Sequence, residues 1–165
     1  MAVKLIGSMI VFLSCTAAGM FLASRDKFRA DELREMKRGL MLLKSELDNS
    51  SRPLYEALID ISERLEGAGS EIFEDSGRLL KSRKVSSASE AWERTLKDRK
   101  SRTFFKKNDI EAFTSFGHNL GGNDRKCQLA NIDMAVEYID MKSEELMKKY
   151  SKDGRLFRSA GVLCG

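Results

Sequence analysis

Side chains that could carry out catalysis or hold a metal are few in this chain and lie far apart. His118 is the only histidine, so no site that needs two histidines can form. Cys15, Cys127 and Cys164 lack the close spacing of a metal site or a disulfide framework. No glycine-rich loop ends in Gly-Lys-Ser/Thr, the pattern that binds the phosphates of ATP. We therefore expect a protein that is not an enzyme and that uses neither a metal nor a cofactor.

Basic residues are concentrated in one region. Residues 78–107 hold eleven Lys or Arg against three acids, a local net charge of +8, whereas the remainder after residue 24 sums to −5. Such a region suits anionic lipid head groups, an acidic protein or nucleic acid. Nucleic acid is disfavoured because neither a helix-turn-helix pattern nor an aromatic-interleaved strand accompanies the charge. The alternative is a solvated helix face followed by a flexible loop. The candidate partner-binding residues of this region are Arg94, Lys97, Arg99 and Lys100.

The elements that would position these residues are predicted to be helices. Strong helix formers dominate the composition, Pro53 is the only proline, and no segment alternates with period two. A seam of apolar residues spaced by three and four predicts a first soluble helix over about 26–48. This narrow seam suits packing within a bundle or a short coiled coil. The seam residues are Leu33, Met36, Leu40, Leu43 and Leu47.

Capping residues and glycines divide the rest of the chain into further helices, which predicts an all-α bundle of about six. Helix starts are expected near Ser51, Ser70, Ser87, Asn108 and Asn123. Helix ends are expected at Gly67 and Gly69, at Gly121 and Gly122, and at Asp153–Gly154 after Ser151. Acids three residues after two of the starts, Glu90 and Glu111, predict capping boxes.

An uncharged segment at the start predicts a membrane-spanning helix over 1–24. Residues 5–24 carry no charge, and twenty helical residues cover about 30 Å, the hydrocarbon thickness of a bilayer. A signal peptide cut near Thr16–Ala18 and a lipoprotein signal at Cys15 are the alternatives. Apolar residues continue past either cut, and basic residues follow from Arg25. This pattern favours a retained anchor with a cytoplasmic bundle over 25–158.

Short motifs along nearly the whole chain resemble the stage III sporulation protein AB family of spore-forming bacteria. In chain order they are Lys4-Leu5-Ile6-Gly7, Arg34, Leu43 with Glu46, Pro53-Leu54, Ala91-Trp92, Phe116-Gly117-His118-Asn119-Leu120-Gly121, Asp124, Gln128 and Arg158 to Leu163. That family is similar to the cytoplasmic domain of the type II secretion F protein, the membrane platform of secretion and type IV pilus machines. The resemblance therefore implies a type II secretion F-domain-like antiparallel bundle held by membrane segments.

The resemblance also implies a function. This would be a non-enzymatic platform subunit of a channel apparatus between mother cell and forespore. Its partners would be a hexameric secretion-type ATPase, stage III sporulation protein AA, and other membrane components of the channel. The bundle would face the mother-cell cytoplasm from the outer forespore membrane, and a homo-oligomer is left open. A membrane-anchored helical sensor or coiled-coil scaffold unrelated to secretion is the alternative.

Two departures from the family pattern affect what is carried over. Family members end with a second apolar span, and we expect residues 159–165 to be the start of one. Secretion F relatives commonly have an acid after the glycine that corresponds to Gly117, whereas this chain has His118, so no acid-dependent contact is carried over. The connection before the last helix gives the other candidate partner-binding residues, for which a plain turn between helices is the alternative. They are Phe116, Gly117, Gly121, Asp124 and Gln128.

Overall fold

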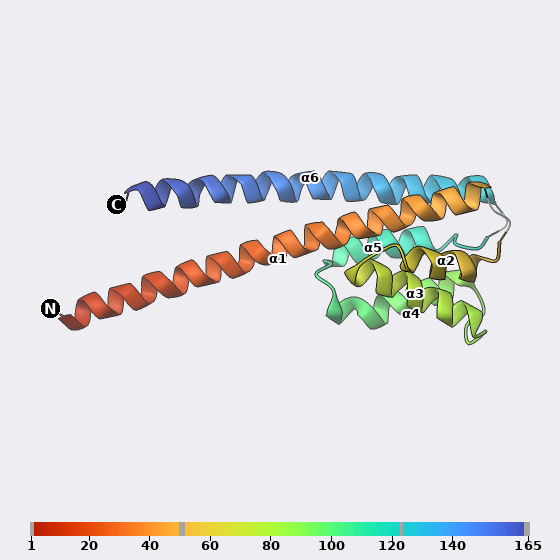
Figure 1. Cartoon of the computed structure of the whole chain (residues 1–165), viewed down its shortest axis with the longest axis horizontal. Coiled ribbons are helices and arrows are strands. Elements are labelled where there is room, and N and C mark those ends of the chain that lie inside the picture. Colours follow the sequence, from red (N-terminus) through yellow and green to blue (C-terminus); the bar gives the residue numbers. More distant parts are fainter. Residues whose placement is uncertain (1, 50–51, 123, 164–165) are drawn as a thin grey trace.

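The structure, a computed structural model, describes residues 2–49, 52–122 and 124–163, with side chains over 24–49, 52–122 and 124–149 (Figure 1). These residues form six α-helices and one short 3-10 helix, and no strand, so the predicted all-α fold is confirmed over this part of the chain. The elements are α1 (Ala2–Asn49), α2 (Leu54–Ser62), α3 (Gly67–Lys81), α4 (Ala88–Arg99), η1 (Lys100–Arg102), α5 (Lys107–Gly117) and α6 (Arg125–Leu163).

Two long helices, α1 and α6, run side by side, and the four shorter ones pack against one half of this pair (Figure 1). The ion pairs Lys37–Asp140, at 2.6 Å, and Lys44–Asp133, at 2.5 Å, show that α1 and α6 are antiparallel. Both long helices extend past the short ones in the same direction (Figure 1). The projecting end of the bundle is defined here by residues 25–32 and 100–107. The opposite, loop end is defined by the connections after α1, α3 and α5.

Helix α1 joins the predicted anchor and the predicted helix over 26–48 in one continuous helix. Among the described residues, no helix contains a stretch long and apolar enough to cross a bilayer. Side chains before residue 24 and after residue 149 lie outside the described part of the chain. The anchor over 1–24 and the second membrane segment over 159–165 therefore stay predictions.

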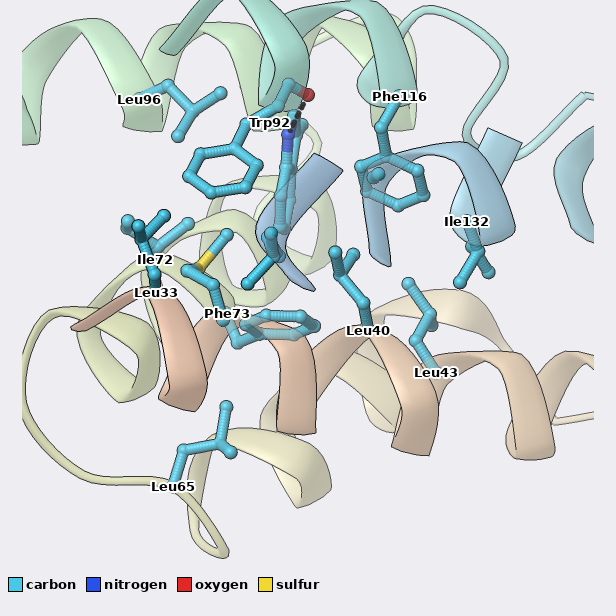
Figure 2. Packing of buried hydrophobic residues seen from close by; sticks show 14 of the residues in the cluster. Leu33, Leu40, Leu43, Leu65, Ile72, Phe73, Trp92, Leu96, Phe116 and Ile132 are labelled. Carbon is cyan, nitrogen blue, oxygen red and sulfur yellow. Dashed lines mark hydrogen bonds between the residues drawn. The ribbon is translucent and has the colours of Figure 1, made fainter. Parts of the chain in front are cut away.

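The seam of α1 forms the floor of the core, as predicted. Leu33, Met36, Leu40 and Leu43 are fully buried, and Leu47 packs at the edge of the same cluster. Trp92 of α4 lies above this floor, with the rings of Phe73 and Phe116 each 5.2 Å away in edge-on contact (Figure 2). The indole Nε1 donates a hydrogen bond to the carbonyl oxygen of Phe113 at 2.9 Å. Trp92 thereby joins α3, α4 and α5 over α1.

Several predicted helix ends were wrong because glycine has another purpose there. Helix α3 begins at Gly67 rather than Ser70, and Gly67 takes the left-handed φ of 56° that starts the turn into it. Gly69 lies inside α3 against α1, where a Cβ would be 3.2 Å from Cβ of Glu35. Gly154 does not close the last helix, since α6 continues to Leu163. A single glycine inside a helix costs only about 1 kcal/mol relative to alanine, which a long helix tolerates.

Of the two predicted capping boxes, one formed in part. Oγ of Ser87 accepts the backbone N–H of Glu90 at 3.1 Å, as predicted, but the Glu90 carboxylate accepts from the N–H of Ser86. The box at Asn108 and Glu111 is wrong. The N-cap of α5 is Lys106, two residues before the predicted cap Asn108, and the carboxylate of Asp109 accepts the backbone N–H of Lys106 at 2.7 Å. The predicted starts at Ser51 and Asn123 lie outside the described residues.

Candidate functional site

Phe116 and Gly117, two of the candidate partner-binding residues, lie inside the core. Phe116 is 3 % exposed and packs its ring edge-on against Trp92. Gly117 is the last residue of α5, earlier than the predicted end at Gly121 and Gly122. A Cβ at Gly117 would overlap the indole of Trp92. The structure thus gives both residues a packing role, and their contact with a partner stays a prediction.

Gly121, Asp124 and Gln128 shape the connection between α5 and α6 at the loop end. Gly121 has a φ of 78°, in the left-handed region that favours glycine. Asp124 directly precedes α6 and caps it, because its carboxylate accepts the N–H of Cys127 at 3.1 Å. Gln128 is buried, and its amide donates to the carbonyl oxygen of Gly122 at 2.5 Å. The predicted turn between helices is therefore present, and Asp124 is the residue that caps α6.

The candidate residues of the basic region do not share one environment. Arg94, Lys97 and Lys100 are exposed along α4 and η1. Arg99 instead turns back onto α3, where it pairs with Glu71 and, at 2.6 Å, with Asp75. Helix α4 also runs from the loop end toward the projecting end, which separates Lys100 from the α5–α6 connection (Figure 1). The two sets of candidate residues are thus not brought together into one site.

A buried polar cluster that the sequence did not reveal joins α1, α5 and α6. Arg29 binds the Asp109 carboxylate in a bidentate manner, with Nε to Oδ2 at 2.7 Å and Nη2 to Oδ1 at 2.8 Å. The hydroxyl of Tyr138 donates to Oδ1 at 2.8 Å, and the N–H of Lys106 donates to Oδ2 at 2.7 Å. The side chain of Asp109 has no exposure, and that of Arg29 has 7 %.

This cluster holds its charges fixed. Burial alone would raise the pKa of Asp109, but hydrogen bonds from Arg29, Lys106 and Tyr138 outweigh it and lower the pKa below its usual value. Burial and the hydrogen bond to Asp109 raise the pKa of Tyr138. The carboxylate accepts four hydrogen bonds, which uses its acceptor capacity and leaves no lone pair for a substrate proton. The cluster therefore serves to fasten three helices together.

No metal site appears in the described part of the chain, where no three His, Cys, Asp or Glu side chains gather closely enough to hold an ion. His118 caps the C-terminal end of α5, with its backbone N–H bonded to the carbonyl oxygen of Thr114 at 3.1 Å, and its side chain is exposed. Exposed basic residues lie at both ends of the bundle: Arg83 and Lys84 at the loop end, and Arg25 and Lys106 at the projecting end.

Comparisons with known proteins agree with this all-helical architecture. The family described as stage III sporulation protein AB matches residues 4–165. Stage III sporulation protein AB of Bacillus subtilis (strain 168) is 26 % identical over 162 residues, which cover 98 % of this chain and 94 % of the relative. A solved structure of a stage III sporulation protein AB superposes with a TM-score of 0.70 at 26 % identity, covering 75 % of this chain and 97 % of the other. The chain therefore belongs to the stage III sporulation protein AB family.

Proposed function

We propose that this protein is a non-enzymatic platform subunit of a sporulation channel apparatus. In this proposal α1 anchors it in the mother-cell (outer forespore) membrane, and the bundle couples a cytoplasmic secretion-type ATPase to the membrane complex. Family membership supports a role in sporulation. The observation that carries the rest is that α1 and α6 leave the bundle at the same end (Figure 1). If that end faces the membrane, the loop end faces the cytoplasm and is open to a soluble partner.

The loop end has features that suit a partner with an acidic surface. Lys81 is exposed at the end of α3, and Arg83 and Lys84 are exposed on the connection that follows it. Arg83 has a φ of 53°, and it follows the C-cap residue Ser82 of α3, a position where helices commonly end in this left-handed conformation. The α5–α6 connection lies beside this one, because a Cβ at Gly121 would be 2.9 Å from Cβ of Ala88. Both connections could therefore meet one partner.

The test is a pull-down of the full chain, solubilised in detergent, with a stage III sporulation protein AA-like ATPase. Lys81→Glu/Lys84→Glu reverses two charges at the loop end. Lys97→Glu/Lys100→Glu reverses two charges on α4 and η1 and is the matched control. We expect the loop-end variant to weaken the complex roughly tenfold or more, since it places acids opposite an acidic surface. The control should bind as the wild type does.

The outcomes separate the parts of the proposal. Loss of binding in Lys97→Glu/Lys100→Glu alone would place the contact at the candidate residues predicted from the sequence on α4 and η1, and would refute the loop end. Absence of any complex between the ATPase and the wild-type chain would refute the coupling itself. Arg99 is kept out of both variants because its pairs with Glu71 and Asp75 hold α4 on α3.

A further inference from the structure

An aromatic pair stands exposed where α1 leaves the bundle. Phe28 of α1 stacks on Phe104 of the connection between η1 and α5, with ring centroids 5.3 Å apart and 22° between the planes. Phe28 is 52 % exposed and Phe104 38 %. A pocket beside Phe104 is lined by Arg25, Lys106 and Lys149, among others. These five residues are termed the Phe104 surface.

The exposure of Phe104 is imposed by the fold around it. The next residue, Phe105, is buried and packs edge-on against Phe113 at 5.2 Å. The carboxylate of Glu32 accepts the backbone N–H of Phe104 at 2.7 Å. The connection is thus fastened on both sides, and Phe104 is held facing outward. Transfer of the exposed surface of the two phenyl rings from water to an apolar phase would be favourable.

The charge around the rings is positive at its outer side. Lys149 and Lys106 both pair with Asp26, at 2.7 Å and 3.9 Å. The side chain of Asp26 is only 19 % exposed, whereas each lysine is 62 % exposed. The carboxylate therefore lies beneath the two ammonium groups, which reach the solvent. Arg25 also lines the pocket, in which Asp26 is the one acid among the lining residues.

The height of this surface along α1 matches a membrane interface. The predicted anchor ends at residue 24, and a helix rises about 1.5 Å per residue, so Phe28 lies about 6 Å beyond the anchor. The head-group layer on each side of a bilayer is roughly 5–8 Å thick. Aromatic and basic side chains are both favoured in that layer. This step depends on the proposed anchoring of α1.

We propose that the Phe104 surface binds anionic phospholipid head groups of the membrane that holds α1. Arg25, Lys106 and Lys149 neutralise head-group phosphates, and the stacked rings enter the interfacial layer beside them. Contact with the bilayer fixes the orientation of the bundle and directs the loop end away from the membrane. An acidic protein is the rival occupant, but the paired rings at this height favour lipid.

The experiment uses the full chain in phosphatidylcholine vesicles, with or without phosphatidylglycerol and with brominated acyl chains as quenchers. Phe104→Trp places a fluorophore on the surface. The wild type is the blank, because its one tryptophan, Trp92, is fully buried. We expect quenching at position 104 to rise with phosphatidylglycerol. Lys106→Gln/Lys149→Gln in the same background should lower the equilibrium constant for contact between this surface and the bilayer roughly 30-fold. Each lysine near an anionic surface raises that constant by a factor of about five.

Lys81→Gln/Lys84→Gln is the matched control and should quench as fully as its parent, because it removes two lysines at the other end. No quenching at position 104 in vesicles that retain the chain would overturn the proposal and favour an acidic protein. Equal quenching in both double variants would overturn it as well. Flotation of the wild type in high salt reports the anchor separately. Release by salt would refute membrane anchoring, whatever the quenching shows.

Discussion

Arg29 and Asp109, eighty positions apart in the chain, form a buried bidentate ion pair between α1 and α5. Asp109 is also the residue whose carboxylate caps the start of α5, and Tyr138 of α6 donates to it. One carboxylate therefore sets the position of three helices at the projecting end. The Phe104 surface lies directly beside this cluster, so its geometry depends on the pair.

Removing the charge of Asp109 is expected to destabilise the bundle strongly. Asp109→Asn keeps the size of the side chain but leaves the buried guanidinium of Arg29 without a counter-charge, which costs about 3–5 kcal/mol. Urea unfolding of the full chain, followed by circular dichroism, measures the loss. Asp140→Asn is the control, because Asp140 pairs with Lys37 at the surface, where the side chain of Asp140 is 54 % exposed. It should cost about 1 kcal/mol or less. Equal losses in the two variants would show that burial of the Arg29–Asp109 pair has no special weight.

The same pair predicts a pH dependence of stability. The pKa of Asp109 is lowered in the folded state from its usual value of 3.8, so the folded protein holds this proton less readily than the unfolded chain. The contribution of the ionised Asp109 to the free energy of unfolding is then complete above pH 4 to 5, and it declines as the pH falls below about 4. In thermal melts over this range, the advantage of the wild type over Asp109→Asn should shrink as the solution becomes more acidic. A constant difference down to the acid limit would contradict the lowered pKa.

Local patterns in the sequence predicted the helical fold well. The spacing of Leu33, Met36, Leu40 and Leu43 indicates one buried helix face, and all four are fully buried. Helix ends were less predictable, because a glycine signals a stop and a close helix contact equally. Gly69 lies inside α3 against Glu35, where contact with a distant helix, rather than a turn, explains the absence of a side chain.

The environments of the charged candidate residues were not predictable from the sequence, because a count of charges does not show which way each side chain points. Arg99 was grouped with Lys97 and Lys100, yet it alone turns toward the acids of α3. In the sequence, Arg29 is one of several basic residues that follow the apolar segment, and Asp109 is one of several acids near helix starts. Nothing in the local sequence distinguishes them as a buried pair. Only the packing of α1 on α5 brings them together.

Arg99 is expected to contribute to stability, in contrast with its exposed neighbour on α4. Arg99→Gln removes the ion pairs with Glu71 and Asp75 and should lower the free energy of unfolding by about 1 kcal/mol. The loss is small because the side chain of Arg99 is 20 % exposed, so that solvent screens its ion pairs. Arg94→Gln should leave the unfolding midpoint nearly unchanged, since Arg94 is exposed. Urea midpoints of the two variants, measured side by side, check the difference. If Arg94→Gln proves the more harmful, the assignment of Arg99 as the structural member is wrong.

Gly117 is expected to be intolerant of any side chain because of Trp92. In Gly117→Ala the new methyl group would overlap an indole that cannot move, since its Nε1 is bonded to Phe113 and its ring is packed between Phe73 and Phe116. We expect a loss of about 1–3 kcal/mol in urea unfolding and a change in tryptophan fluorescence.

Two further variants identify the cause. Ser115→Ala changes an exposed position of the same helix and should be nearly neutral. Trp92→Ala removes Cγ, Cδ1 and Nε1, the indole atoms that a Cβ at Gly117 would meet, so adding Gly117→Ala to it should cost less than in the wild type. Additive losses would refute steric overlap. If Gly117→Ala is folded and still binds the ATPase with wild-type affinity, the residue acts in packing, and the partner contact predicted for it from the sequence is wrong.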